Sequence, residues 1–453
     1  MKILLIYPQT NGKVVGGDML FIHEPLSLEY LGAAVKDSHD VKILDMRISD
    51  KLAETLASFS PNVVGITAFT LHVNRAKDIL KAVKAHDRDI LTVVGGPHAT
   101  ALPEDFHEDF VDVVVIGEGT FPFREIVNRA EGNKDLKGIS GTSVRDNGRF
   151  VSTPPRTYPG LDALPFPDRS LTAGFRDRYF TPFMKPLASI KSSIGCSHRC
   201  NYCMLWKITD GRFMPRDPVK VAEELAGIRE SNVFFADDDT LLDGDRMIEL
   251  AKVIRKQGIA KKYQVNGRAD TIAGRPDVIE KWREIGLASV VMGFESYRDE
   301  DLQYFHRGMK VSANREALRI LRENDILPVG YFIVRPDYDR KNFEDLKNYI
   351  HGLNLKYMIF TVLTPIPGTD LYEESKSRII KNDYDLYDFR HTLLPTKLPL
   401  EEFYAELADL FETAVPRWKG ILRLFEKPLK EIIPTHRRNK EITTQLKNAY
   451  KDY

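Results

Sequence analysis

The three cysteines of the sequence lie within eight residues, in the run Gly-Cys-Ser-His-Arg-Cys-Asn-Tyr-Cys that begins at Gly195. Because the spacing is short, the thiolates of Cys196, Cys200 and Cys203 can converge on one inorganic centre, and soft sulfur ligands select zinc or iron–sulfur. A closed structural zinc site needs four ligands, usually as two separated pairs. Three thiolates on a 4Fe–4S cluster instead leave one iron free for a substrate or cofactor. The pattern therefore favours a cluster over zinc, a disulfide framework or scattered buried thiols.

The composition excludes several classes of function. The 453 residues include 65 basic and 65 acidic side chains, so no global field attracts nucleic acid or an anionic membrane. No apolar stretch reaches the length of about 18 residues that a transmembrane helix needs. The apolar run at residues 1–8 lacks a signal-peptide cleavage site and predicts a buried first strand. Free thiols and an oxygen-labile cluster indicate a reducing cytoplasm, and the length predicts two or three domains.

Residues 1–135 alternate short apolar runs with helical patterns, which predicts a doubly wound, Rossmann-like α/β domain with a parallel sheet. Ligands bind beyond the carboxyl ends of such strands. Gly95, Gly96, Gly117 and Glu118 follow two of those ends, and glycine there lets the backbone approach a ligand closely. The expected strands are 2–7, 41–44, 63–67, 91–94 and 113–116, with helices at 27–37, 75–85 and 121–131.

The second half of the chain shows a further alternation of strand and helix patterns. After a proline-rich linker over 136–185, residues 186–375 contain six βα units, which predict an open (β/α)6 barrel with its site at the carboxyl ends of the strands. Residues 376–453 are expected to form a helical, solvated C-terminal cap, with a substrate-covering lid as the alternative. The expected strands are 188–193, 232–236, 263–266, 289–293, 328–334 and 357–363, and the expected helices are 218–230, 246–257, 276–286, 313–324 and 342–352.

The spacing CxxxCxxC with an aromatic residue, Tyr202, before the last cysteine resembles the signature of radical S-adenosylmethionine (SAM) enzymes. In that family the open iron chelates the amino and carboxylate groups of SAM. The reduced cluster then cleaves SAM to methionine and a 5′-deoxyadenosyl radical, which abstracts hydrogen from an unactivated carbon. The resemblance implies a partial barrel for the second half, in agreement with its strand pattern, and places Tyr202 among the cofactor-binding residues.

The first half resembles the cobalamin-binding domain that precedes many radical SAM catalytic domains. The segments that carry the resemblance are 23–32, 65–70, 93–98 and 115–119. It implies that Gly95, Gly96, Gly117 and Glu118 border the cobalamin. The Asp-x-His-x-x-Gly motif of domains with a histidine on cobalt is missing after the first strand, so cobalamin is expected base-off without a protein histidine. A degenerate domain that binds no cobalamin is the alternative.

The same resemblance proposes contacts to SAM for residues at the ends of the barrel strands. Asp237 and Asp238 would lie near its amino group, Arg268 near its carboxylate or a substrate anion, and Glu295 and Ser296 near its ribose or methionine part. For each of them a structural hydrogen bond is the alternative.

Two further residues follow the last two barrel strands. The turn that contains Pro367 would bring backbone close to the adenine of SAM. Arg335 stands where relatives have glycine, and we expect it to touch the substrate as a catalytic-site residue. The rival interpretation is a salt bridge from Arg335 to Asp337 or Asp339.

The function follows from the cysteine count together with the resemblance. With no further thiolate, the chain can hold neither an auxiliary cluster nor a methyl-carrying cysteine. The resemblance then implies cobalamin-dependent methylation of an unactivated carbon in a small-molecule or lipid substrate. One SAM would methylate cobalt(I), a second would yield the radical, and an external donor such as flavodoxin or ferredoxin would supply electrons. Non-methylating radical chemistry with a vestigial cobalamin domain is the first alternative, and a cobalamin-binding sensor module is the second.

Overall fold

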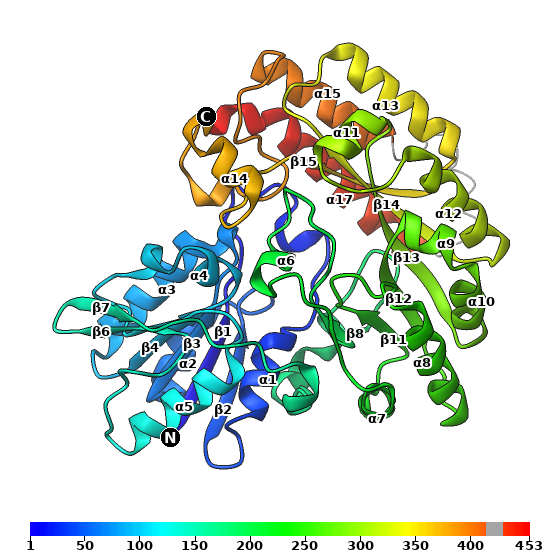
Figure 1. The fold of residues 1–453 in the computed structure, drawn as a ribbon. Coiled ribbons are helices and arrows are strands. Elements are labelled where there is room, and N and C mark those ends of the chain that lie inside the picture. Colours follow the sequence, from blue (N-terminus) through cyan, green and yellow to red (C-terminus); the bar gives the residue numbers. More distant parts are fainter. Residues whose placement is uncertain (414–428) are drawn as a thin grey trace. The chain divides into compact units, whose positions relative to one another are not determined.

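The computed structural model describes residues 1–413 and 429–453 (Figure 1). Contacts within the chain divide it into two compact units, which we describe one at a time. The first unit comprises Met1–Asn11 and Ile22–Phe180, and the second comprises Gly12–Phe21 and Thr181–Tyr453. The segment 12–21, which lies within the domain expected at 1–135, is thus part of the second unit.

The first unit is built on one sheet in the order β2-β1-β3-β4-β5-β6-β7. Its first five strands are parallel, as predicted, and β3 is buried along its whole length. Strand β1 pairs with both β2 and β3, so the strand order reverses there, and ligands of such sheets bind at this reversal. The parallel strands are β1 (Lys2–Tyr7), β2 (Asp40–Asp45), β3 (Val63–Thr67), β4 (Leu91–Gly95) and β5 (Val113–Val115), and the helices are α1 (Leu26–Ala33), α2 (Leu52–Phe59), α3 (Val73–His86), α4 (Pro97–Ala101) and α5 (Thr120–Glu131).

The segment expected as a linker, 136–185, contributes two strands to this sheet. β6 (Thr142–Asp146) and β7 (Arg149–Ser152) form an antiparallel hairpin. Its two turn residues, Asn147 and Gly148, have φ values of 49° and 78°, as the Asn-Gly turns of tight hairpins require. The hairpin was not predicted because its strands are short and prolines are frequent around them, so the segment has no clear alternation of apolar and polar residues.

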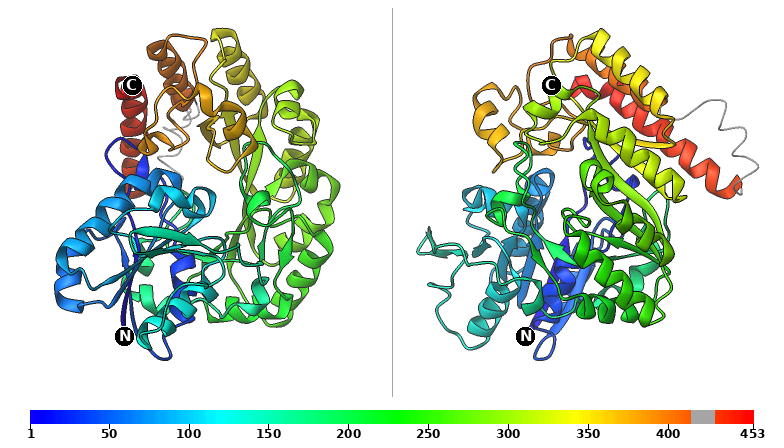
Figure 2. Two further views of the ribbon diagram at one scale, coloured as in Figure 1. Left: turned by 60° about the vertical axis from the view of Figure 1, so that its left-hand side comes forward. Right: turned by 45° about the vertical axis from the view of Figure 1, so that its right-hand side comes forward.

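The second unit contains the predicted six-stranded parallel sheet, in the order β15-β14-β13-β12-β11-β8. Neighbouring strands follow one another in the sequence, with helices along the outside of the curved sheet (Figures 1 and 2). This is the open barrel expected from the pattern. The strands are β8 (Leu187–Ile190), β11 (Asn232–Phe235), β12 (Lys262–Arg268), β13 (Leu287–Glu295), β14 (Leu327–Val334) and β15 (Tyr357–Val362), and the connecting helices include α7 (Pro218–Gly227), α8 (Gly244–Lys256), α10 (Pro276–Glu284), α12 (Val311–Glu323) and α13 (Arg340–Leu353).

A layer of aromatic side chains holds the barrel strands to their helices. Trp282 of α10 is fully buried and meets the rings of Phe235 and Tyr263 edge to face, at centroid distances of 5.3 and 5.6 Å. Its indole Nε1 donates a hydrogen bond to the carbonyl of Met247 at 2.8 Å, so its polar atom is satisfied inside the core. The strands whose ends carry the site are thereby fixed from behind.

Helices also follow the barrel, as predicted for residues 376–453. α15 (Leu400–Thr413) buries one face and packs against α13 and α17 (Leu429–Asn448). The part of the expected cap at 414–428 lies outside the described residues.

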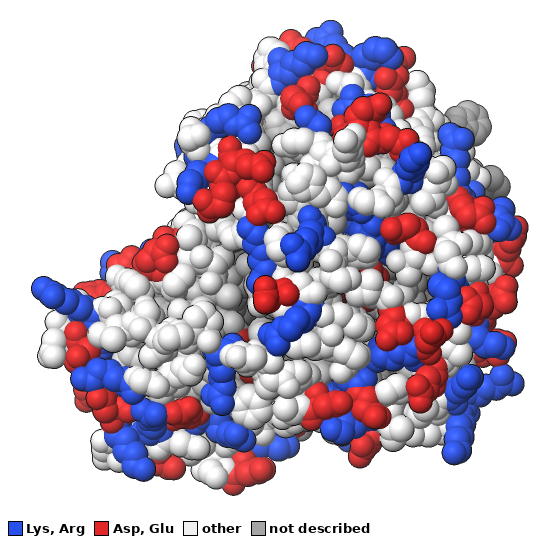
Figure 3. Space-filling model, viewed as in Figure 1, with Lys and Arg blue, Asp and Glu red and all other residues white. Residues whose placement is uncertain are grey.

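The surface is in keeping with the balanced composition. Lys and Arg side chains alternate with Asp and Glu side chains over the face in Figure 3. Within the described ranges, no helix combines the length and the apolar character that crossing a membrane requires.

Candidate active site

The three cysteines lie on one loop and line one cavity in the second unit. The loop (residues 195–213) is closed at its base by the antiparallel pair β9 (Ser193–Ile194) and β10 (Met214–Pro215). The cavity has a volume of about 550 Å³ and opens where the barrel strands end. Gly195 has φ +89°, and a Cβ there would lie 2.0 Å from the carbonyl oxygen of Arg212. Only glycine lets the two ends of the cysteine loop approach so closely.

The three thiols share one environment at this cavity. Burial raises the pKa of Cys196 to about 11 and that of Cys203 to about 12, and the nearby Cys200 contributes to both shifts. Among the described residues, no three Cys, His, Asp or Glu side chains converge on one point as the ligands of a single ion do. Three thiols of adjacent loop positions around a shared cavity, with no fourth thiol in the chain, fit a 4Fe–4S cluster with one open iron.

An acidic wall follows β11. Asp238 lines the cavity and accepts a hydrogen bond from the backbone amide of Gly195 at 2.7 Å, which ties the cysteine loop to the strand end. Asp239 also lines the cavity and is only 3% exposed, and among the described residues no side chain hydrogen-bonds to either of its oxygens. Burial raises its pKa to about 7, although Arg268 and Arg307 oppose that rise. A buried carboxylate with both oxygens available suits an ammonium group.

A basic wall faces these carboxylates from the end of β12. Arg268 lines the cavity, and its Nε and Nη2 donate to the two carboxylate oxygens of Asp270 at 2.9 and 2.8 Å. Nη2 also donates to the backbone carbonyl of Arg307 at 2.5 Å. Within the described part of the chain, the buried Nη1 has no hydrogen-bond partner. That nitrogen can donate to a carboxylate in the cavity.

Two predicted residues complete the polar side. Tyr202 is packed edge to face against Phe305, with ring centroids 5.5 Å apart. Glu295 has the left-handed φ of 60° next to a register irregularity in β13, and its Oε1 lies 3.1 Å from Nη2 of Arg307. Such an irregularity redirects a side chain at a strand end, and both residues line the cavity.

A second group of lining residues is apolar. Its side chains come from the ends of four barrel strands and from the segment after β15, and only Phe389 is exposed, at 43%. Phe389 has φ +61°, an uncommon conformation for a bulky residue that often marks a functional segment. These apolar lining residues are Phe234, Val291, Tyr331, Ile333, Val362, Leu363 and Phe389, and Leu205 of the cysteine loop, 38% exposed, also lines the cavity.

Some residues predicted for the site do not line the cavity. Asp237 is fully buried and accepts hydrogen bonds from the amides of Ser192 and Ser193 at 2.6 and 2.9 Å and from the Ser192 hydroxyl at 2.6 Å. Ser296 donates to the carboxylate of Asp301 at 2.6 Å. For these two residues the structure shows structural hydrogen bonds, which were the alternative to contact with SAM in the sequence analysis.

Arg335 and Pro367 also stand outside the cavity lining. The guanidinium of Arg335 pairs with Asp301 at 3.1 Å and with Asp337 at 2.5 Å, and it lies over the ring of Tyr304 at 4.3 Å. The salt bridge to Asp337 is the rival interpretation of the sequence, and it satisfies the charge that was expected to need a substrate. Pro367 is buried in the turn after β15.

Among the acidic, basic and histidine side chains that line the cavity, three were absent from the predicted site. Asp239 belongs to the run of three aspartates, of which the sequence analysis assigned only the first two to the site. His198 stands between two of the cysteines, and burial, followed by the charge of Arg268, lowers its pKa. Arg307 comes from the segment between α11 (Asp299–Tyr304) and α12, and nothing in its sequence spacing indicated that it reaches Cys200.

In the first unit, the predicted glycines lie at the carboxyl ends of β4 and β5. Gly96 has φ +108°, and a Cβ there would lie 2.8 Å from the backbone of Ala68. Gly117 has φ +86°, and its Cβ would meet no described atom within 4 Å. Glu118 accepts a hydrogen bond from the amide of Thr120 at 2.7 Å, while a Cβ on Gly95 would make only ordinary contacts. The open backbone at Gly117 suits close approach by a large ligand such as the expected cobalamin, whereas glycine at 96 is required by the close packing of its backbone against Ala68.

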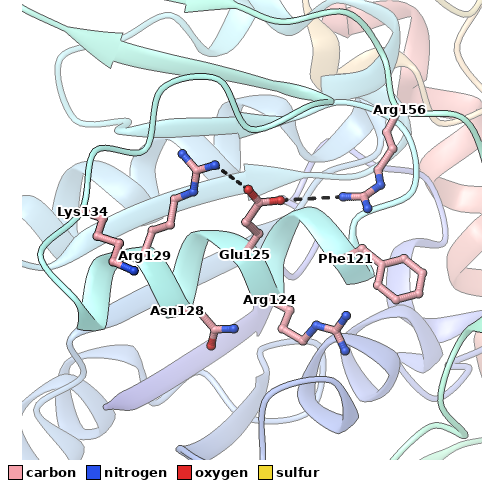
Figure 4. A pocket seen from close by; sticks show the side chains of 7 residues that line it. All are labelled: Phe121, Arg124, Glu125, Asn128, Arg129, Lys134 and Arg156. Carbon is pink, nitrogen blue, oxygen red and sulfur yellow. Dashed lines mark hydrogen bonds and ion pairs between the residues drawn. The ribbon is translucent and has the colours of Figure 1, made fainter.

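A pocket of the first unit lies on α5, and none of the predicted glycines lines it. It has a volume of about 300 Å³ and contains four cationic side chains. Figure 4 shows Glu125 between Arg129 and Arg156, at 2.6 and 3.9 Å. This carboxylate already pairs with two of the cations, and none of the predicted site residues lies there.

Two family models match this chain. Residues 12–127 match the B12 binding domain, and residues 190–350 match the radical SAM superfamily. The chain is 29% identical to the hopanoid C-3 methylase of Methylococcus capsulatus over 93% of its own length and 81% of that protein. It is 31% identical to an uncharacterized methyltransferase of Pyrococcus horikoshii, over 82% and 83% of the two chains. Its fold matches that of the cobalamin-dependent SAM radical enzyme OxsB with a TM-score of 0.74, at 14% identity, over 99% of this chain and 71% of that one.

Proposed function

Because the chain belongs to the radical SAM enzymes that carry a B12-binding domain, we propose that it is a cobalamin-dependent methylase of an unactivated carbon. The observation that carries this proposal is one cavity with three thiols, in a chain that has no other thiol and that also carries a B12-binding domain. A single cluster uses all three thiols, so none remains to hold an auxiliary cluster or to carry a methyl group. Cobalamin is then the group in this chain that can carry a methyl.

The polar side of the cavity supports binding of SAM. When bound, the cluster would supply the electron that cleaves SAM, and cobalamin would carry the methyl group. Asp239, buried and without a side-chain partner among the described residues, would accept hydrogen bonds from the SAM ammonium group. The Nη1 group of Arg268 would donate to the SAM carboxylate. Asp270 holds Arg268 in the required orientation with two hydrogen bonds.

The apolar group of lining residues supports a substrate with a large hydrocarbon surface. Its side chains would exclude water from the reacting carbon. The similarity to a hopanoid methylase supports a lipid or another small molecule of this character. We further propose an external one-electron donor such as flavodoxin or ferredoxin, and a reducing compartment, the cytoplasm, for the labile cluster.

The test is methyl transfer by the anaerobically reconstituted chain. The protein is loaded with cobalamin and given SAM with a deuterated methyl group, a one-electron reductant and a panel of hopanoid lipids and tetrapyrroles. We expect deuterated methyl to appear on a carbon of one panel member, together with 5′-deoxyadenosine. Cys200→Ala is the control, since it should bind cobalamin and lose both products.

Two outcomes would contradict the proposal. A product that forms with 5′-deoxyadenosine but without the label would support the non-methylating alternative. Cobalamin binding without any cleavage of SAM would support the binding module.

A further inference from the structure

Arg307 places a buried cation against one of the three cysteines. Its Nη1 lies 3.6 Å from the Sγ of Cys200, and its Nη2 lies 3.1 Å from the carboxylate of Glu295 and 3.4 Å from the carbonyl of Gly293. The residue is 9% exposed, so these contacts are shielded from water. The geometry is that of an N–H donor directed at sulfur and held from behind by a carboxylate.

The backbone around Arg307 is also held in place. His306 and Gly308, its two neighbours, both have positive φ, 53° and 68°, which makes a tight turn. The backbone carbonyl of Arg307 accepts the hydrogen bond from Arg268 at 2.5 Å. The backbone that carries the side chain is thus fixed, and the guanidinium can leave Cys200 only by breaking its contacts with Glu295 and Gly293.

The charge of Arg307 persists in this buried position. Arginine remains ionised at any pH at which the protein is folded. A fixed positive charge thus accompanies the Cys200 sulfur in every redox state of a bound cluster.

We propose that Arg307 is a positioning residue that raises the reduction potential of the cluster through its contact with the Cys200 thiolate. One-electron reduction adds negative charge to the cluster and its sulfur ligands, while an external one-electron donor is oxidised and no bond breaks. A nearby cation and an N–H···S hydrogen bond stabilise the reduced form more than the oxidised form. Glu295 acts in the opposite sense, because it is an anion at the same place and partly neutralises the cation.

This inference rests on the cluster and is separate from the proposal of methylation. A cluster that is reduced too rarely cannot cleave SAM, whatever the fate of the radical. If the Arg307 variants shift the reduction potential as expected but the wild-type chain transfers no methyl group, the result counts against the proposed function alone. A changed potential with normal products would leave the proposed function standing.

The test is a redox titration of the reconstituted holoprotein with dithionite, followed by paramagnetic resonance of the reduced cluster. Arg307→Gln is compared with wild type and with Arg319→Gln, which removes an exposed arginine of α12 that is paired with Glu316 and Glu323. In Arg307→Gln we expect the ratio of reduced to oxidised cluster at a fixed potential to fall at least tenfold. That change corresponds to a shift of about 59 mV to more negative potential for a one-electron couple. In Arg319→Gln the ratio should stay at the wild-type value.

Two further variants keep the proposal testable if Arg307→Gln takes up too little iron. Glu295→Gln leaves the arginine in place and removes its counter-charge, so its potential should become more positive. Arg307→Lys keeps a cation without the planar fork, so its potential should lie at or below that of wild type and above that of any loaded Gln variant. Potentials that stay at the wild-type value in Glu295→Gln and in the loaded Arg307 variants would overturn the proposal. They would leave Arg307 as a purely structural tie.

Discussion

Three consecutive aspartates after β11 have three different environments. Asp237 is consumed by three hydrogen bonds, Asp238 holds the cysteine loop through one, and no described side chain hydrogen-bonds to the buried carboxylate of Asp239. The sequence showed the run of aspartates but not which of them faces the cavity, because the direction of each side chain depends on how the chain turns beyond β11. The sequence did not predict a role for Arg307 either, because its contact with Cys200 joins residues 107 positions apart.

At this scale we expect Asp239→Asn to weaken SAM binding about tenfold, or about 1.4 kcal/mol, because an amide cannot neutralise the ammonium group. The check is the dissociation constant of SAM for the reconstituted protein. Asp237→Asn is the matched control. It should bind SAM like wild type but lose about 2 kcal/mol of stability, since hydrogen bonds to a buried carboxylate are disrupted. Equal SAM affinity in Asp239→Asn and wild type would refute the assignment.

Arg335 leads to a different expectation from the one that its position in the sequence suggested. It pairs with Asp301 and Asp337 and is partly exposed. We expect Arg335→Gln to lower the free energy of unfolding by about 1 kcal/mol or less. SAM cleavage in the absence of substrate should stay at the wild-type rate. A selective loss of substrate turnover in this variant would instead restore the contact with substrate that the sequence predicted.

At the scale of elements, periodicity and spacing predicted the parallel strands of both sheets. Each is a short apolar run followed by a helix, and that local signal is strong. The pair β9 and β10 was missed because it is two residues long and is held by contacts across the cysteine loop. The place of residues 12–21 was missed for a similar reason. The amide of Val15 donates to Asp388 at 2.9 Å and that of Gly16 to Gln445 at 2.8 Å, and no local pattern records such distant partners.

The segment that carries Phe389 is fastened by a buried histidine. His391 contacts Asp388 through Nδ1 at 3.0 Å and Asp452 through Nε2 at 3.2 Å. Burial acts to lower the pKa of His391, but the charge of Asp388 and the hydrogen bonds to both carboxylates outweigh it, and the pKa is raised from 6.5. A raised pKa means that the folded form holds the proton more tightly. This contribution to stability is therefore complete below about pH 6.5 and is lost as the pH rises through the folded-state pKa.

We expect hydrogen exchange in residues 388–392 and 449–453 to become faster as the pH rises above that value, after correction for the intrinsic pH dependence of exchange. In Asp452→Asn the same amides should exchange faster already at pH 6, and the remaining pH dependence should be smaller. Peptide-resolved mass spectrometry measures both effects. Identical pH profiles for the variant and wild type would show that this contact does not fasten the segment.

At the scale of the whole molecule, the chain pairs two α/β units that are each suited to a large cofactor. The composition is balanced in charge, and the face drawn in Figure 3 shows side chains of both signs mixed. The chemistry is concentrated in a loop of 19 residues (195–213) and in the strand ends around it. All further claims about SAM, substrate and reduction potential depend on the centre that the three cysteines hold.

The most direct measurement is therefore the iron, sulfide and zinc content of the chain after anaerobic reconstitution. We expect about four irons and four sulfides per chain, the content of one 4Fe–4S cluster. Replacement of Cys196, Cys200 or Cys203 by Ala should abolish SAM cleavage in a folded protein. Zinc at full occupancy, with no iron taken up by the wild-type chain, would contradict the account.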